Sequence, residues 1–492
     1  MTTLRALEDL RFDNTYARLP EAFYAKLTPT PFSTPPQLVS FNPAAAALID
    51  LDPEQAARPE FAGVFGGSLL VPGMEPLATL YAGHQFGVYV PQLGDGRAIL
   101  LGEAVSDSGM RWDLQLKGAG LTPFSRDGDG RAVLRSTIRE YLCCEAMQGL
   151  GIPTTRALSI VGSDDRVYRE QIETGAMLLR MAPSHVRFGT FEVFYYRQQY
   201  DQLRILADYV IEQFYPHLMT RSEKYAEFFA EVVSRTAELI ARWQAVGWAH
   251  GVMNTDNMSI LGITLDYGPY GFMDDYEPGF ICNHSDHNGR YAFDQQPYIG
   301  LWNLSCLAQA LLPLAPKEAL KQSLDSYSSI FDRHWLTRMR RKLGFEQERA
   351  DDAALVSDLL SLMAASRTDY PRLFCSLCEC SLSDTGRNDS IRDQFLDREG
   401  FDRWAERYRA RLREEESRDE DRRQRMRRVN PKYVLRNYLA QVAIEKAQQK
   451  EYAEIDRLLT ILHHPFDDHP GMESYTLPPP HWGKHLVVSC SS

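Results

Sequence analysis

The sequence predicts an α+β fold in which a strand-rich N-terminal part precedes a mainly helical C-terminal part. Glycine-rich turns and alternating apolar and polar residues, typical of strands, occupy residues 81–190. Beyond them, apolar residues recur with helical spacing, as over residues 201–215 and 224–246. With 492 residues and 44% hydrophobic content, the chain can form a large core and more than one lobe.

The composition excludes several classes of protein. Lys and Arg total 54 and Asp and Glu total 66, so the net charge of −12 argues against nucleic acid as the main partner. No apolar run approaches membrane-spanning length, and the first residues resemble neither a secretory signal nor a transit peptide. Eight cysteines in so long a chain do not form a disulfide framework. We expect a cytoplasmic monomer that binds neither membrane nor nucleic acid.

A glycine-rich turn opens the first long strand. Gly94 and Gly96 flank Asp95, Arg97 follows, and residues 98–105 have the apolar character of a strand. Because glycine carries no Cβ, backbone amides in such a turn can approach a phosphate closely. An ordinary hairpin turn has the same composition, so the turn alone does not decide between the two.

The next strand and helix contain a candidate ion pair. An alternating strand over residues 112–117 ends in Lys117, and a helix is expected over residues 131–150. Glu140 in this helix is the predicted partner of Lys117, with Glu145 as the alternative. Kinase-like folds place a glycine-rich turn, a strand lysine and a helix glutamate in this order. Taken singly, such a lysine and such a glutamate are most often solvated.

Two further segments supply candidates for phosphate binding. A second loop, over residues 118–131, is rich in glycine and aspartate and contains Asp129 and Gly130, although a flexible connector has the same composition. Arg180 ends a predicted strand, and Arg187 follows seven residues later. Two arginines that flank one loop can clamp a triphosphate bidentately, and salt bridges are the alternative use of the same side chains.

The segment from His250 to Gly268 has the character of a metal site. In kinase-like folds an Asn and an Asp hold Mg²⁺ against the phosphates, and Asn257 and Asp266 fit these positions. The catalytic base of protein kinases stands five residues before this Asn, where the present chain has Val252. Asp256 stands directly before Asn257 instead. The chain is therefore either a catalytically dead kinase or an enzyme with a rearranged site in which Asp256 is the base.

These features together predict a protein-kinase-like two-lobed fold with N-terminal and C-terminal extensions. In the helical part we expect helices over residues 298–312 and 319–343 and one long solvated helix over residues 403–428. The predicted divisions are an irregular, proline-rich N-terminal wrap (1–80), a nucleotide-binding lobe (81–190), a mainly helical lobe with the metal and catalytic site (191–465) and an extended tail (466–492).

Several motifs together resemble the selenoprotein-O family of pseudokinase-fold proteins over nearly the whole chain. They are Gly-His-Gln-Phe-Gly (83–87), Gly-Asp-Gly-Arg (94–97), Gln-Leu-Lys-Gly-Ala-Gly (115–120), His-Gly-Val-Met-Asn-Thr-Asp-Asn-Met (250–258), Leu-Asp-Tyr-Gly-Pro-Tyr-Gly-Phe-Met-Asp (265–274) and Phe-Ile-Cys-Asn-His-Ser-Asp (280–286). The resemblance implies protein AMPylation, in which AMP passes from ATP to Ser, Thr or Tyr hydroxyls of protein substrates and pyrophosphate is released.

The resemblance also implies that ATP lies flipped relative to a kinase, with its γ-phosphate deep and its α-phosphate facing the acceptor. Lys117, ion-paired to Glu140, would neutralise the distal phosphates together with Arg180 and Arg187. Fixed cations there would meet the growing charge of the leaving pyrophosphate. The residues implied to line the nucleotide are Gly94, Gly96, Arg97, Asp129 and Gly130.

The remaining implied roles concern the metal, the base and a redox pair. Asn257 and Asp266 would hold Mg²⁺ or Mn²⁺, and Asp256 would be the base. The alternatives are an atypical kinase that transfers the γ-phosphoryl group and a nucleotide-sensing pseudokinase scaffold without turnover. Cys490 lies in the tail, where some relatives carry selenocysteine, and is hypothesised to form a regulatory disulfide with Cys282. Two free thiols are the alternative.

Overall fold

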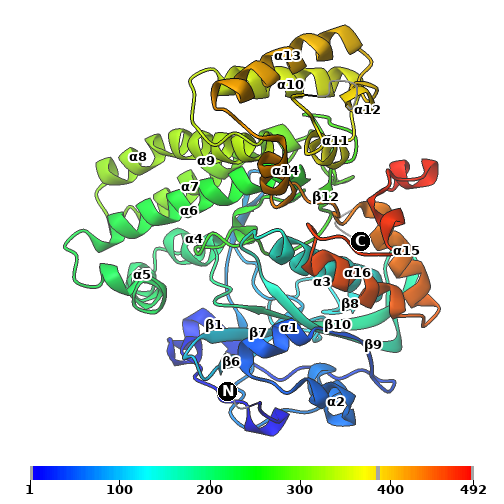
Figure 1. Cartoon of the computed structure of the whole chain (residues 1–492). Helices are drawn as coiled ribbons and strands as arrows, with labels where there is room; N and C mark the ends of the chain where they lie inside the picture. The colour runs from blue at the N-terminus through cyan, green and yellow to red at the C-terminus, as the bar shows by residue number, and fades with distance from the viewer. Residues whose placement is uncertain (1–3, 384–387, 489–492) are drawn as a thin grey trace.

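The computed structural model describes residues 4–383 and 388–488. Figure 1 shows the N-terminal, blue-to-cyan segments gathered around a β-sheet, with the green-to-yellow helices on the other side of the molecule. The mixed α/β composition predicted from the sequence is confirmed. The order of the parts along the chain also agrees, with strands preceding most of the helices.

One antiparallel sheet of eight strands organises the N-terminal part. Its order is β1-β3-β6-β7-β10-β9-β2, and β8 pairs with β10. Two small sheets pair β4 with β5 and β11 with β12. The strands are β1 Tyr24–Lys26, β2 Gln37–Phe41, β3 Leu77–Thr79, β4 Gly83–Gln85, β5 Val88–Val90, β6 Ala98–Val105, β7 Arg111–Lys117, β8 Ala132–Val133, β9 Arg156–Tyr168, β10 Ile172–Ala182, β11 Trp248–Ala249 and β12 Gly271–Phe272.

The helices fill the spaces between and beyond the strands. They are α1 Pro43–Ala46, α2 Pro59–Phe65, α3 Leu134–Gly149, α4 Phe188–Tyr196, α5 Tyr200–Phe214, α6 Lys224–Val246, α7 Gln296–Leu311, α8 Lys317–Asp325, α9 Tyr327–Lys342, α10 Asp352–Ser366, α11 Tyr370–Leu377, α12 Asp389–Arg392, α13 Arg398–Glu414, α14 Asp419–Arg427, α15 Asn437–Gln448 and α16 Ala453–His463. None of those in the described part of the chain has the length and apolar sequence that crossing a membrane requires.

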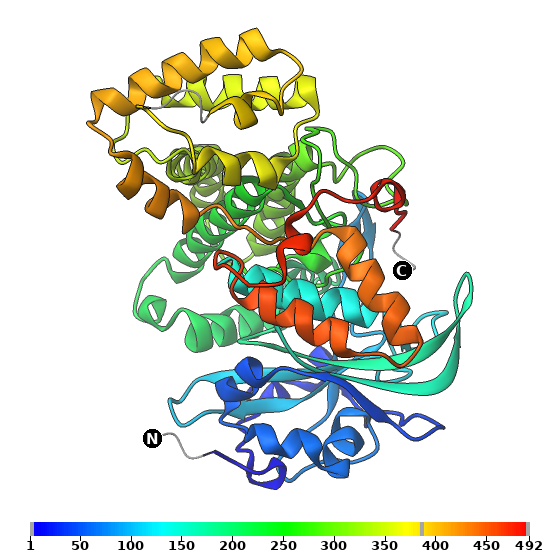
Figure 2. The ribbon, with the colours of Figure 1, turned by 45° about the vertical axis from the view of Figure 1, so that its right-hand side comes forward.

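The main sheet is covered on both faces, because side chains alternate along each strand. On β10, Met177, Leu179 and Met181 belong to a buried cluster shared with α1 and α2. Ala176 and Leu178 belong to the cluster on the opposite face, which contains residues of α3, α15 and α16. Figure 2 shows the orange-to-red C-terminal helices beside the cyan α3, so the end of the chain packs against the helix that carries Glu140.

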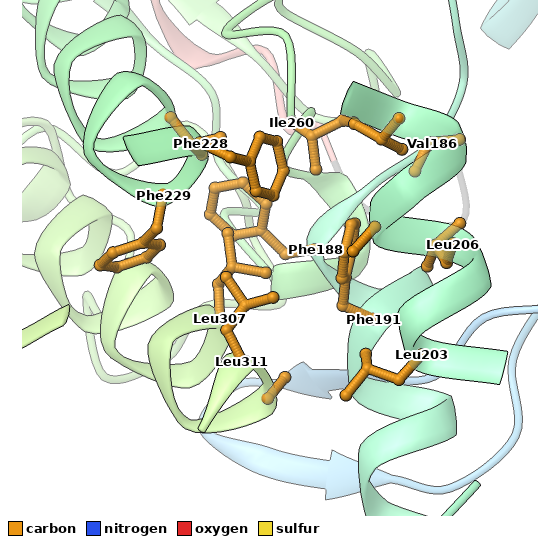
Figure 3. Close-up of a cluster of buried hydrophobic side chains, with 14 of the residues drawn as sticks. Val186, Phe188, Phe191, Leu203, Leu206, Phe228, Phe229, Ile260, Leu307 and Leu311 are labelled. Carbon is orange, nitrogen blue, oxygen red and sulfur yellow. The ribbon is translucent and has the colours of Figure 1, made fainter. Parts of the chain in front are cut away.

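Helices α4 to α7 surround a third buried cluster. This cluster also contains residues of the loop at 258–260, which directly follows Asn257. Phe188 and Phe191 of α4 lie with Phe228 of α6, Leu307 of α7 and Ile260 in this cluster (Figure 3). All five side chains are fully buried. Burial of a large apolar side chain contributes about 1.5–3 kcal/mol, so the cluster anchors α4 and the loop at residues 258–260 together.

Two regions differ from the sequence-based expectation. The prediction of one long solvated helix over residues 403–428 is wrong, because α13 ends at Glu414 and α14 begins at Asp419. Glu416 between them has a φ of 55°, and no glycine or proline marks this break in the sequence. Arg422 is fully buried and bonded to Cys380 O, so the charges are not all solvated. Likewise, residues 319–343 fall within two helices, α8 and α9.

The N-terminal segment predicted as a wrap is part of the main sheet. Residues 1–80 supply β1, β2 and β3 to this sheet, and α1 and α2 cover one of its faces. These strands have only three to five residues, too few for alternation to stand out in the sequence.

Candidate active site

A cleft of about 750 Å³ brings together most of the residues predicted to bind nucleotide and metal. It is lined by the turn at residues 94–98, the loop at residues 124–131 and the two ends of the segment 252–269. The predicted residues that line it are Gly94, Gly96, Arg97, Lys117, Asp129, Gly130, Arg180, Asp256, Asn257 and Asp266. Glu140 and Arg187 do not line the cleft and lie behind it.

The predicted ion pair between β7 and α3 is present. Lys117 donates a hydrogen bond to Glu140, whose side chain is about 1% exposed. Glu140 also accepts from Arg180 Nη1 at 2.9 Å, and Arg180 Nε donates to Gln115 Oε1 at 2.7 Å. The alternative partner, Glu145, is ion-paired elsewhere. Because β7 and β10 are neighbours in the sheet, both cations reach the same carboxylate.

Asp266 extends this pair into a chain of alternating charges. Its two carboxylate oxygens accept hydrogen bonds from Arg180 and Arg187 respectively. Burial opposes its ionisation, but the two arginines and Lys117 outweigh burial and hold the pKa of Asp266 well below its ordinary value. Its φ of 58° is uncommon for a residue other than glycine, and such backbone conformations concentrate at functional sites.

The two arginines predicted as a phosphate clamp have different positions. Arg180 lines the cleft and Arg187 does not, although both are nearly fully buried, at about 3% and 1% exposed. Arg187 Nη1 donates to the backbone oxygen of Asp256 at 2.6 Å, and its guanidinium stacks over the ring of Tyr81 at 4.4 Å. Arg187 therefore ties Asp266 to the backbone of the loop that carries Asp256.

The predicted base and the first metal ligand lie in a short 3-10 helix, η7 (Thr255–Asn257). Asp256 Oδ2 accepts a hydrogen bond from Gln85 Nε2 at 3.2 Å. Its Oδ1 is buried and has no hydrogen-bond partner among the described residues. Burial is the main cause that raises the pKa of Asp256 to about 7. Asp256 and Asp266 thus line the same cleft, but the pKa of Asp256 is raised and the pKa of Asp266 is lowered.

The oxygen donors at this end of the cleft fit a hard divalent cation. Asn257 Nδ2 donates to Val252 O at 2.9 Å, so the other atom of the amide, its oxygen, is the one suited to a metal. Asp266 supplies an ionised carboxylate on the same cleft. Mg²⁺ and Mn²⁺ prefer carboxylate and carbonyl oxygens to nitrogen or sulfur. No cysteine or histidine lines the cleft in the part of the chain that the structure describes.

The glycines of the first turn serve close packing between two loops. A Cβ on Gly94, which has a φ of 114°, would lie 2.6 Å from the ring of Phe124, and one on Gly96 would lie 2.8 Å from Phe124 O. The loop at residues 124–131 can therefore cover the turn only because glycines stand there. Arg169 holds Asp129 in this loop through two hydrogen bonds of 2.8 and 2.9 Å.

Of the two cysteines in the hypothesised disulfide, only Cys282 lies among the described residues. Cys282 is buried, and a Cβ on Gly251 would lie 2.7 Å from its sulfur, so this thiol touches the segment that leads to Asp256. Val488 O accepts a hydrogen bond from His284 N at 2.8 Å, which brings the C-terminal tail against the loop of Cys282. Cys490 itself lies outside the described residues.

Sequence reasoning missed the residues that surround Asp256. Gln85 contacts its carboxylate, and His84, Glu192 and Thr255 form the hydrogen bonds beneath it. The motif Gly-His-Gln-Phe-Gly was visible in the sequence but suggested no role. Glu192 carries no local signal at all, because its partners are far away in the chain.

Comparison with known proteins identifies the family of the chain. The family described as Protein adenylyltransferase SelO matches residues 6–463. A protein nucleotidyltransferase YdiU of Myxococcus xanthus is 60% identical over 489 residues, covering 99% of this chain and 100% of the relative. Proteins of the same name from Thioalkalivibrio sulfidiphilus and Thiobacillus denitrificans are 57% and 55% identical, again over 99% of this chain and 100% of each relative. The chain belongs to the SelO family of protein adenylyltransferases.

Proposed function

We propose that this chain transfers AMP from ATP to Ser, Thr or Tyr hydroxyls of protein substrates and releases pyrophosphate. Family membership over residues 6–463 supports the reaction class. The observation that carries the proposal is the cleft itself, which is lined by Lys117 and Arg180 and also by Asp256. The two cations suit a polyphosphate, and the unpaired carboxylate oxygen of Asp256 suits a proton acceptor.

In the proposed reaction the acceptor hydroxyl oxygen attacks the α-phosphorus and forms a new phosphorus–oxygen bond. The bond between the α-phosphorus and the oxygen of pyrophosphate breaks, and pyrophosphate leaves with its electron pair. Asp256 takes the hydroxyl proton, which requires an ATP orientation with the α-phosphate toward Asp256. Lys117 and Arg180 then meet the charge that develops on pyrophosphate. Arg187 contributes from behind by holding Asp266 and the loop of Asp256.

Asn257 and Asp266 are the proposed ligands of Mg²⁺ or Mn²⁺. When bound, such an ion would neutralise phosphate charge and orient the α-phosphate. Gly94, Gly96, Arg97, Asp129 and Gly130 are the proposed lining of the nucleotide. The accompanying architecture is a protein-kinase-like pair of lobes, supported by the strand-to-helix order of the chain and by the Lys117–Glu140 pair.

The position of an isotope label in ATP distinguishes this function from the alternatives. The purified chain is incubated with candidate proteins and ATP labelled at either the α- or the γ-phosphate. Label on protein from the α-position only, with a mass increase of one AMP, is the expected result. Label from the γ-position only would show a kinase, and nucleotide binding without either label would show a scaffold. The other ribonucleoside triphosphates are compared in the same assay, because the relatives' names do not specify the nucleotide.

The proposal also includes a regulatory disulfide and the oligomeric state of the chain in solution. The tail segment that ends at Val488 lies against the loop of Cys282, which supports a disulfide between Cys282 and Cys490. Such a bond would tie the tail to the segment that leads to Asp256. The acidic composition supports protein rather than nucleic acid as the partner. A cytoplasmic monomer is proposed, and light scattering of the purified chain measures its mass in solution.

A further inference from the structure

A small β-hairpin covers the proposed base. Strands β4 and β5 pair in register, and β4 lies directly over η7. A Cβ on Gly83 would lie 2.5 Å from Asp256 Oδ1, and the neighbouring Gln85 donates to Asp256 Oδ2. The position of the Asp256 carboxylate is therefore set by where this hairpin lies. Nothing in the proposed transfer step explains what holds the hairpin there.

A closed ring of hydrogen bonds joins the hairpin to η7. His84 N donates to Thr255 Oγ1 at 2.7 Å, and Thr255 Oγ1 in turn donates to Glu192 Oε2. The other oxygen of Glu192 lies 2.6 Å from His84 Nδ1, so the imidazole closes the ring. The Glu192 side chain is about 0% exposed and that of His84 about 11%. Hydrogen bonds to a buried carboxylate are about twice as strong as neutral ones.

Each member of the ring comes from a different element. His84 lies on β4, Thr255 begins η7, and Glu192 lies on α4. Helix α4 is itself fixed to both, because Gly189 O accepts from Ala82 N at 3.0 Å and Phe188 N donates to Met258 O at 2.9 Å. The ring therefore lies where three segments meet, one residue away from Gln85 on the hairpin and one residue away from Asp256 on η7.

We propose that Glu192, Thr255 and His84 are positioning residues of the transfer reaction. They lock the β4–β5 hairpin onto η7, so that Gln85 and Asp256, which both line the cleft, have one fixed arrangement. None of the three lines the cleft. The proposal rests on the proposed function for its catalytic consequence, but its structural part concerns the hairpin alone.

A metal site is the competing use of the same side chains. Ligand atoms of His84, Glu192 and Cys306 lie within 4.8 Å of one another. The 2.6 Å between His84 Nδ1 and Glu192 Oε1 is a hydrogen-bond length, and both Glu192 oxygens already have donors. The direct ring therefore accounts for the geometry without an ion. Stoichiometric zinc or another transition metal in the purified chain, lost on Glu192→Gln, would overturn the proposal.

The test removes one hydroxyl and restores it. Thr255→Val keeps the shape of the side chain but deletes both of its hydrogen bonds in the ring, whereas Thr255→Ser keeps the hydroxyl. The matched control is Thr236→Val on α6, because Thr236 is equally buried and its hydroxyl has no partner in the described part of the chain. For each variant we measure kcat for AMP transfer, the Kd for ATP, the melting temperature and amide exchange of residues 83–87.

Thr255→Val is expected to lower kcat about 10- to 100-fold, the usual effect of removing an outer-shell partner, while the Kd for ATP changes less than about twofold. The His84 amide, which loses its acceptor, is expected to exchange about tenfold faster. Thr255→Ser and Thr236→Val should match the unmodified chain in both measurements. Equal loss of ATP binding and of kcat, or no change in kcat, would overturn the positioning role.

The exchange measurement separates this proposal from the proposed function. If the unmodified chain transfers no AMP, the proposed function fails. The ring is still confirmed if Thr255→Val speeds exchange at residues 83–87 and Thr255→Ser does not. If the chain is active and exchange at these residues is the same in both variants, the ring does not hold the hairpin. Glu192→Gln, which cannot accept both hydrogen bonds, should reproduce the Thr255→Val result.

Discussion

Two aspartates that line the same cleft have opposite surroundings. Asp266 lies between Arg180 and Arg187, and its pKa is held well below its ordinary value. Asp256 is buried against a hairpin, with Gln85 as its hydrogen-bond donor, and its pKa is raised to about 7. Pairs of carboxyl groups whose surroundings separate their pKa values commonly divide two catalytic roles between them.

The difference follows from which partners surround each carboxylate. Fixed cations favour the charged form, whereas burial with few donors favours the neutral form. An ionised carboxylate suits a metal ion, and one that can take a proton near neutral pH suits a base. Substituting Asp266 and Asp256 one at a time tests whether they have different roles.

The largest effect is expected from Asp266→Asn. The change keeps the shape but removes the charge that Arg180, Arg187 and the proposed metal share. Loss of metal-assisted charge stabilisation predicts a fall in AMP transfer of about 10⁴-fold. Transfer of α-label over a titration of Mg²⁺ and Mn²⁺ measures it. Activity within tenfold of the unmodified chain would remove Asp266 from the metal site.

Asp256→Asn is expected to have the next largest effect. Without a proton acceptor, kcat should fall about 10³-fold, in the range of general-base contributions. The Kd for ATP should stay within about twofold, because Lys117 and Arg180, and not Asp256, are the proposed contacts of the phosphates. Calorimetric titration with ATP, beside the α-label assay, separates the two quantities. A parallel loss of ATP affinity would show that Asp256 holds the nucleotide instead.

A carboxylate outside the cleft, Glu145, provides a contrast, because its loss is expected to lower the stability of the fold without a direct effect on AMP transfer. Glu145 on α3 accepts hydrogen bonds from Arg156 at 2.7 Å and from His463 of α16 at 2.8 Å. Burial opposes its ionisation, but His463 and Arg156 outweigh burial and lower the pKa of Glu145 to about 2. Its stabilisation is fully present above the unfolded pKa of about 4.5 and is lost as pH falls through about 2.

Glu145→Gln should therefore lower the free energy of unfolding by about 3 kcal/mol at pH 7, and the difference should shrink between pH 4.5 and pH 2. Urea unfolding at several pH values measures this. Glu399→Gln is the control, since Glu399 is exposed on the first turn of α13. A pH-independent difference between Glu145→Gln and the unmodified chain would contradict the assignment.

The smallest effect is expected from Cys282→Ser under reducing conditions, where AMP transfer should stay within about twofold of the unmodified chain. The Cys282 thiol donates to Ala249 O at 3.5 Å, and the serine hydroxyl can donate to the same acceptor. Under mild oxidation the unmodified chain and Cys282→Ser should diverge, and peptide mapping without reductant should find Cys282 joined to Cys490. Equal oxidant responses in both proteins would exclude this disulfide. Cys378→Ser serves as the matched control, because Cys378 is also buried and donates to a backbone oxygen, Phe374 O, at 3.3 Å.

Local patterns predicted much of this molecule. Alternation located β7, the apolar run after a glycine-rich turn located β6, and helical spacing located α3, α5 and α6. The order of a glycine-rich turn, a strand lysine and a helix glutamate predicted the ion pair of Lys117 with this helix, and the structure selects Glu140 over the alternative Glu145. The break between α13 and α14 was missed, since Glu416 adopts a left-handed φ without a glycine to announce it.

The positions of the arginines show the limit of such patterns. Arg180 and Arg187 are seven residues apart and looked equivalent in the sequence. Only the packing of α4 against the loop of Asp256 decides that Arg187 is buried and that Arg180 faces the cleft. The glycines at 94 and 96 were likewise predictable as a tight turn, but the Phe124 loop that requires them was not.

The sequence by itself determined the residue types of the site, because Asp256, Asn257 and Asp266 lie close together in the chain and Lys117 and Glu140 belong to neighbouring elements. Tertiary structure alone decided how Asp256 differs from Asp266. The partners responsible come from distant segments: Gln85 donates to the buried Asp256, whereas Arg180 and Arg187 contact Asp266. Protonation depends on distances of a few ångströms, and only the folded chain sets those distances.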